Sequence, residues 1–171
     1  MKKIIASLFL LAAVQSISAQ SPYVTAPDPQ HPQTYILNGI ISKYALINDP
    51  TFSWYGSSAA GYNPAPEYKA AMEAAAKNNV KLIVFGGTWC EDSHFILPKF
   101  FKLQEQANFP DASISFFAVD RNKKTIGGIT DALGITNVPT IIVMKNGKET
   151  GRVVEYGKTG QWDKELAELL K

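Results

Sequence analysis

An apolar run, Val80–Gly86, lies shortly before a helical stretch in this chain of 171 residues. The run reads VKLIVFG, and its β-branched and aromatic residues predict a strand buried inside a sheet. Over Cys90–Ala107 the apolar residues return at helical spacing, with Ile96, Phe100 and Leu103 in one stripe. A buried strand that leads into an amphipathic helix indicates a domain of alternating strands and helices.

The same alternation extends over the rest of the chain from residue 66. Asn146–Gly147 between two apolar runs is a strong hairpin signal, and Gly134 is suited to end a short helix. The order predicts an α/β fold, a mixed central sheet with helices on both faces. The other predicted elements are a helix at Pro66–Lys77, strands at Ile114–Val119, Thr140–Met144 and Gly151–Tyr156, a short helix ending at Leu133, and a final helix from about Gly160.

Residues 21–65 have a less regular pattern. Ser21–Thr34 holds four prolines in fourteen residues, which predicts an extended spacer. Tyr35–Ile47 has enough apolar residues to pack, and its periodicity leaves helix and strand open. Phe52–Pro64 mixes aromatic and small residues, so we expect an ordered loop there.

Residues 1–20 have the three-part pattern of a secretory signal peptide. Two lysines precede the apolar run Ile4–Val14, and small polar residues follow it, with a cut expected near Ala19 or Gln20. A run of eleven residues is too short to span a bilayer core of about 30 Å. We therefore expect a periplasmic or secreted protein that has no membrane anchor after cleavage.

Charge and residue clusters argue against several classes of partner. Without the two lysines of the predicted signal, basic and acidic residues fall from 17 against 15 to 15 against 15, which leaves no global field for nucleic acid or anionic membrane. Lys123–Lys124 is too short for a nucleic-acid patch. Cys90, His31 and His94 do not form a zinc set, and the glycine pairs lack phosphate-loop spacing, so we expect no metal and no cofactor.

Cys90 is the single cysteine of the chain, and it cannot form an internal disulfide. At the start of a helix, a thiol meets unpaired N–H groups and the positive end of the helix dipole, which favour the nucleophilic thiolate. A lone exported thiol is reactive, paired with another chain, or buried. Gly86 and Gly87 just before it make this a poor core position, which favours the reactive thiol.

Two motifs resemble the thioredoxin family. VFGGTWCEDSHFILPKF, at residues 84–100, resembles the family's strand–WCxxC–helix segment, with a helix proline eight residues after the cysteine. Residues 134–170 resemble its second half, and Val138–Pro139–Thr140 match the cis-proline loop. The resemblance covers residues 66–171 and implies a thioredoxin-like domain there, which follows the predicted signal peptide (1–20) and a Pro-rich spacer and N-terminal extension (21–65).

This resemblance implies a substrate-binding site around Cys90. It places Pro139 beside the thiol, with a cis peptide bond before it. The backbone of Val138 would be offered to an extended peptide by strand addition. Trp89 would form part of the apolar rim, although plain packing explains it equally well.

The departures from the family concern the second thiol. Ser93 stands at the place of the resolving cysteine, so Cys-x-x-Cys becomes Cys-x-x-Ser, and Val84 replaces a buried acid. Ser93 cannot expel a bound partner. The resemblance then implies monothiol exchange, with Cys90 and Ser93 as catalytic residues and with Ser93 as a hydrogen-bond donor to the thiolate. Partners would be exported proteins bearing thiols or disulfides, and an external thiol or reductase would release them.

Three neighbours of Cys90 are candidate modulators of its ionisation. Glu91 and Asp92 disfavour a thiolate, or simply suit the first turn of a helix. His94 adds positive charge if it is protonated, near pH 6.5 by its reference value, or is a simple surface residue. Because these effects oppose one another, the balance between thiol and thiolate at Cys90 stays open. Two other functions also stay open: a redox-inactive peptide-binding module, and a peroxide-reactive cysteine protein.

Overall fold

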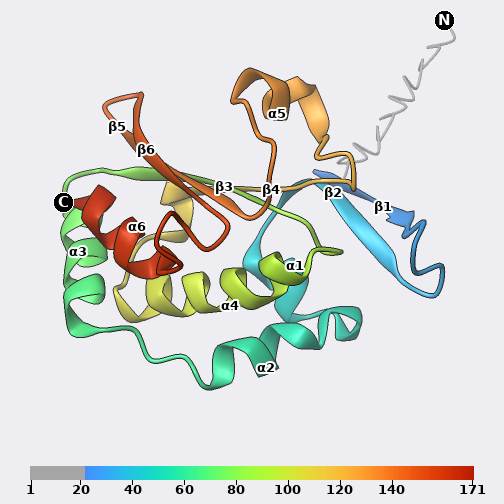
Figure 1. Cartoon of the computed structure of the whole chain (residues 1–171), viewed down its shortest axis with the longest axis horizontal. Helices are drawn as coiled ribbons and strands as arrows, with labels where there is room; N and C mark the ends of the chain where they lie inside the picture. Colours follow the sequence, from blue (N-terminus) through green and yellow to red (C-terminus); the bar gives the residue numbers. More distant parts are fainter. Residues whose placement is uncertain (1–21) are drawn as a thin grey trace, which may run out of the picture.

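The computed structural model describes residues 22–171 and places six strands in one sheet (Figure 1). The strand order is β1-β2-β4-β3-β5-β6, with β3 and β4 parallel and every other pair antiparallel. The predicted signal peptide lies outside the described residues. The strands are β1 (Tyr23–Pro27), β2 (Tyr35–Ile41), β3 (Lys81–Gly86), β4 (Ile114–Ala118), β5 (Thr140–Lys145) and β6 (Lys148–Val154).

Helices cover both faces of this sheet, which confirms the predicted α/β fold. One face carries a layer in which α3 packs against α6 and α4, and α2 packs against α4, whereas α5 lies on the other face (Figure 1). Within residues 22–171, no helix has the length and hydropathy needed to cross a membrane. The helices are α1 (Lys43–Ile47), α2 (Trp54–Ala60), α3 (Pro66–Lys77), α4 (Glu91–Gln106), α5 (Ile129–Ala132) and α6 (Trp162–Leu170), with 3-10 turns η1 (Pro50–Phe52), η2 (Asp111–Ser113) and η3 (Ile126–Gly128).

The core has two parts because successive side chains of β3 point to opposite faces of the sheet. Leu82 and Val84 join the large cluster beneath α3, α4 and α6. Phe85 joins a smaller cluster with Val119, Ile135, Val138 and Ile142 on the side of α5. Trp89 and Cys90 pack against this smaller cluster, so the predicted site lies at its border.

The N-terminal extension forms part of the sheet. The prediction of a spacer over Ser21–Thr34 is wrong for β1, which pairs antiparallel with β2. Prolines are tolerated there because β1 is an edge strand and Pro27 is its last residue. Tyr35–Ile47, which the periodicity leaves open, divides into β2 and α1.

The prediction of a loop over Phe52–Pro64 is also wrong, since Trp54–Ala60 forms helix α2. Glycine and serine lower its intrinsic helix propensity, and tertiary packing against α4 overrides that preference. The turn before α2 is stabilised by Asp49, whose carboxylate accepts the Thr51 N–H at 2.9 Å.

The elements after residue 65 largely match their prediction. Helix α3 has the predicted bounds, and β3 begins one residue later than expected. Asn146 and Gly147 both have positive φ, 52° and 75°, as a two-residue hairpin turn requires. Because the turn is only two residues long, β6 begins at Lys148 rather than Gly151, and it ends at Val154.

Candidate active site

Cys90 is the residue directly before helix α4, where the chain turns out of the sheet. Its backbone is extended, its carbonyl accepts the His94 N–H at 2.9 Å, and its own N–H donates to the Gly87 carbonyl at 3.0 Å. A Cβ atom at Gly87 would lie 2.7 Å from the Trp89 indole, so the turn requires glycine. Cys90 is half-buried.

The sulfur faces the loop that enters β5. The Sγ–H of Cys90 donates to the Val138 carbonyl at 3.2 Å, and the peptide bond between Val138 and Pro139 is cis. The structure thus brings together the thiol and the proline loop, 48 residues apart in sequence, as the resemblance predicts. The side chains of Val138 and Pro139 are buried, so the loop presents its backbone to the sulfur.

Ser93 has a different role from the predicted one. Its side chain is fully buried, and its hydroxyl accepts the Gly87 N–H at 3.1 Å. No hydrogen bond joins Ser93 and Cys90 in the part of the chain that the structure describes. The physical reason is that the buried Gly87 amide needs an acceptor, and the Ser93 hydroxyl is the group in reach. Ser93 therefore stabilises the turn that carries the thiol.

His94 is a packed side chain. Its ring stacks on Trp54, with centroids 4.0 Å apart, and its Nε2 lies 2.8 Å from the Thr88 carbonyl. A carbonyl only accepts, so Nε2 carries the proton and donates. Burial lowers the pKa of His94 below 6.5. Burial therefore makes His94 harder to protonate than a free imidazole, which weakens the expected positive charge beside Cys90.

Glu91 and Asp92 occupy the first turn of α4, at the positive end of its dipole. Glu91 is exposed and Asp92 is half-buried. Partial burial, together with the nearby Asp92 carboxylate, raises the pKa of Tyr156 above 10.0. One of the two acids therefore faces an aromatic side chain that the sequence had not assigned to the site.

Two exposed aromatic residues lie near Asp92. Phe95 is 46% exposed and Tyr156 is 37% exposed, and their ring centroids are 5.7 Å apart. The Lys99 ammonium lies 2.8 Å from the centre of the Phe95 ring. The local signal for Phe95 is its place outside the apolar stripe of α4, but nothing local in the sequence connects it with Tyr156.

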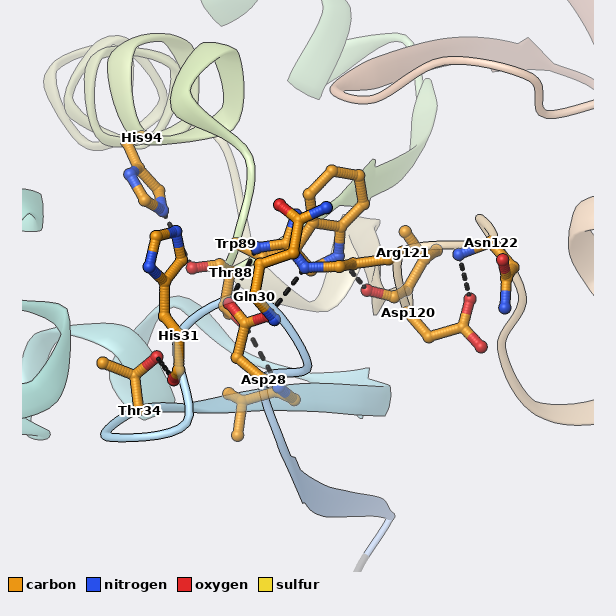
Figure 2. Close-up of polar contacts among 12 residues, drawn as sticks. Asp28, Gln30, His31, Thr34, Thr88, Trp89, His94, Asp120, Arg121 and Asn122 are labelled. Atoms are coloured by element: carbon orange, nitrogen blue, oxygen red, sulfur yellow. Dashed lines mark hydrogen bonds and ion pairs between the residues drawn. The ribbon is translucent and has the colours of Figure 1, made fainter.

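Trp89 is held from two sides. Its indole Nε1–H donates to the Val119 carbonyl at 2.9 Å, and the Arg121 guanidinium carbon lies 5.1 Å from its ring. Arg121 in turn donates from Nε and Nη2 to both carboxylate oxygens of Asp28, at 2.7 and 2.8 Å (Figure 2). Arg121 is the main cause that lowers the pKa of Asp28 to about 2. Sequence analysis missed Asp28 and Arg121, because no local pattern links residues 93 apart.

The extension meets the active-site turn at further points. The Leu37 N–H donates to the Thr88 hydroxyl at 3.1 Å, and the Trp54 ring stacks on the His94 ring. A pocket of about 270 Å³ opens between the extension and the turn, and both His31 and His94 line it. Within residues 22–171, no group of three or more His, Cys, Asp or Glu side chains is placed to hold a metal ion.

A mixed sheet with a cysteine at the start of a helix, facing a cis-proline loop, defines a thioredoxin fold with a thiol site. The family profile described as Thioredoxin matches residues 59–167, and the chain belongs to the thioredoxin family. Membership supports a thiol–disulfide redox function.

Individual thioredoxins are similar over about half of this chain. Thioredoxin-1 of Saccharomyces cerevisiae is 31% identical over 91 residues, which cover 52% of this chain and 82% of the yeast protein. The thioredoxin of Alicyclobacillus acidocaldarius is 27% identical over 90 residues, which cover 53% of this chain and 81% of the bacterial protein. The crystal structure of Malassezia sympodialis thioredoxin is 28% identical, covers 54% of this chain and 73% of its own, and has a TM-score of 0.38.

Proposed function

We propose that this chain is an exported, single-thiol oxidoreductase that exchanges disulfides with protein partners through Cys90. The observation that carries the proposal is the position of half-buried Cys90 at the start of α4, with its sulfur 3.2 Å from the Val138 carbonyl. A sulfur at a helix N-terminus suits nucleophilic attack, and the neighbouring backbone suits the approach of an extended peptide.

The proposed step begins with loss of the Cys90 proton to solvent. The thiolate attacks one sulfur of a partner disulfide, so the partner S–S bond breaks while a Cys90–partner S–S bond forms. The other partner sulfur leaves as a thiolate and takes up a proton from solvent. The Cys90 sulfur is oxidised and the leaving partner sulfur is reduced, so the step balances without a separate oxidant.

Release of the partner needs a thiol from outside the chain. The sequence holds one cysteine, and the Ser93 hydroxyl is already bonded to the Gly87 N–H. An external thiol therefore attacks the mixed disulfide. Attack at the partner sulfur forms a disulfide between the partner and the external thiol and frees the Cys90 thiolate. Attack at Cys90 frees the partner thiol and leaves Cys90 in a disulfide with the external thiol, which a second external thiol then reduces. A low-molecular-weight thiol or a reductase of the same compartment supplies it.

The surroundings of Cys90 favour a protein partner. Phe95 and Tyr156 form an exposed aromatic pair, and Trp89 adds a half-buried indole beside the thiol. Exposed aromatic groups of this kind supply contact area to a bound chain at low entropic cost. We therefore propose exported proteins with accessible disulfides as substrates.

A disulfide-bonded peptide tests the proposed chemistry. The full chain is incubated with the peptide, and adducts are followed by mass spectrometry with and without reduced glutathione. We expect a Cys90–peptide adduct that accumulates without glutathione and disappears when glutathione is added. Cys90→Ser is the matched control and should form no adduct.

Two other results would overturn the proposal. A Cys90 thiol that is alkylated by iodoacetamide but never exchanges with the peptide would support the redox-inactive binding module. Trapping of a sulfenic acid on Cys90 by dimedone after peroxide treatment, without exchange, would support the peroxide-reactive cysteine.

Export is tested separately. Expression of the full chain in a Gram-negative host should place it in the periplasm or the medium, with a new N-terminus near residue 20. Mass spectrometry of the purified protein identifies that terminus. Retention of Met1 on protein found only in the cytoplasm would contradict export.

A further inference from the structure

Two cationic side chains surround the indole beside the reactive thiol. The Arg121 guanidinium carbon lies 5.1 Å from the Trp89 ring, and the Lys123 ammonium lies 5.7 Å from it. Both residues follow strand β4, whereas Trp89 directly precedes Cys90. The sequence places these residues about 30 positions apart, and the fold gathers them around the indole of the residue that precedes Cys90.

Arg121 is held in a defined orientation. Its Nε and Nη2 atoms donate to the two oxygens of Asp28, whose side chain is only 3% exposed. The Arg121 side chain is 19% exposed. Nη1 has no hydrogen-bond partner among residues 22–171, so its N–H groups are available to a ligand. A planar guanidinium fixed in this way is pre-organised for a second oxygen ligand.

Two cations, Arg121 and Lys123, and two carboxylates, Asp28 and Asp120, lie in this region, so the charges around Trp89 balance. Asp28 offsets the charge of Arg121, and Lys123 remains without an ion-pair partner among residues 22–171. The Asp120 carboxylate accepts two backbone N–H groups of its own turn. Glu91, at the start of α4, lines the same pocket as Asp28 and Trp89, so binding of an anion there depends on a direct hydrogen bond from Arg121 Nη1 rather than on a general positive field.

We propose that Arg121, held by Asp28 and stacked on Trp89, binds an anionic group of the partner next to the sulfur that Cys90 attacks. This inference rests on the proposed exchange. The ligand is a carboxylate, so the favoured partner is a disulfide with an Asp or Glu side chain close to its cysteine. A charge-assisted hydrogen bond from Arg121 provides the selectivity.

Two small disulfides test the inference directly. Dithiobis(nitrobenzoate) carries two carboxylates, whereas dithiodipyridine is neutral, and both release a coloured thiol when Cys90 attacks. Because both reactions consume the same thiolate, the ratio of their rates does not depend on how much thiolate is present. We expect Arg121→Gln to lower the anionic-to-neutral ratio about tenfold or more, as the loss of one hydrogen bond to a charged group implies.

Matched variants separate a specific contact from a general field. Arg121→Lys keeps the charge without the planar fork, so it should recover less than half of the lost ratio. Lys148→Gln removes an exposed cation at the distant hairpin turn and should leave the ratio unchanged. In about 0.5 M salt, where the Debye length is about 4 Å, the difference between unmodified protein and Arg121→Gln should shrink.

The outcomes distinguish this inference from the proposed exchange. If the unmodified protein reacts with neither disulfide, the exchange fails and this inference fails with it. If it reacts with both, and Arg121→Gln changes the ratio less than twofold, the inference alone is overturned. An equal drop in Lys148→Gln would also overturn it.

Reaction of each variant with the neutral disulfide shows that the fold around Cys90 is intact. A peptide pair with Glu or Gln beside the cysteine should show the same preference.

Discussion

Replacing Asp28 by asparagine tests whether the N-terminal extension is bound to the active site by charge. The Asp28 carboxylate is buried, bonds to Arg121 through both oxygens and accepts the Gln30 N–H at 3.0 Å. Asp28→Asn keeps the size of the side chain and one acceptor oxygen. It removes the negative charge and one of the two bonds to Arg121.

The pKa of Asp28 sets the size of the effect. Its hydrogen bonds to Arg121 outweigh the opposing effect of burial and lower the pKa from 3.8 to about 2. A difference of this size corresponds to about 2.4 kcal/mol at neutral pH, since one pKa unit is worth about 1.4 kcal/mol. Arg121 is partly exposed, and water screens some of this interaction, so we expect Asp28→Asn to lose about 1 to 2.4 kcal/mol of unfolding free energy.

The loss should depend on pH in a defined direction. The folded-state pKa lies below the unfolded value, so the stabilisation is complete above about pH 4 and is lost as pH falls toward 2. The deficit of the variant should therefore be about halved near pH 3. Urea unfolding of both proteins at pH 7, 5 and 3, monitored by tryptophan fluorescence, measures this deficit in unfolding free energy. Glu73→Gln, in an exposed ion pair with Lys77, is the matched control and should not change the midpoint.

A deficit of the same size at pH 7 and pH 3 would refute this reasoning, because a loss caused by packing does not follow the titration of Asp28. A deficit in Glu73→Gln equal to that in Asp28→Asn would refute it as well. It would mean that any carboxylate of an ion pair, buried or exposed, contributes equally.

Three further predictions address the site and its support. In Ser93→Cys, the added thiol should attack the mixed disulfide at Cys90 from within the chain, so the peptide adduct should no longer accumulate in mass spectra without glutathione. Gly86→Ala places a methyl group against the Leu97 side chain and should cost about 1–3 kcal/mol in urea unfolding. Because the pKa of His94 is lowered, stability falls as pH drops below 6.5, so the unmodified protein should lose more unfolding free energy between about pH 7 and 5 than His94→Gln.

The sequence was sufficient to predict those elements of the fold for which local signals and topology agree. The apolar run before Cys90 predicted a buried strand, and Asn146–Gly147 predicted the hairpin, because each depends on residues close in sequence. The resemblance then placed the Val138–Pro139 loop beside the thiol, and the structure confirms that contact. Helix α2 was missed because its stability comes from packing against α4 rather than from its own propensity.

The chemistry of individual side chains was harder to predict. Ser93 and His94 lie one turn from Cys90, which suggested direct effects on its sulfur. The Gly87 amide and the Thr88 carbonyl bind them instead, and these backbone groups have no signature in sequence. The ion pair of Asp28 and Arg121 joins positions 93 residues apart, so only the folded chain reveals it.

Strand β1 has a consequence for how copies of this chain behave when concentrated. It places five residues outside β2, so the main-chain edge that β2 would otherwise leave open is already occupied. Pro22 precedes this outer strand and Pro27 ends it, and neither has an N–H to offer to another strand. Short, proline-flanked borders of this kind discourage edge-to-edge aggregation. The extension thus covers the edge of β2 with a short, proline-flanked strand, besides contacting the residues around the thiol.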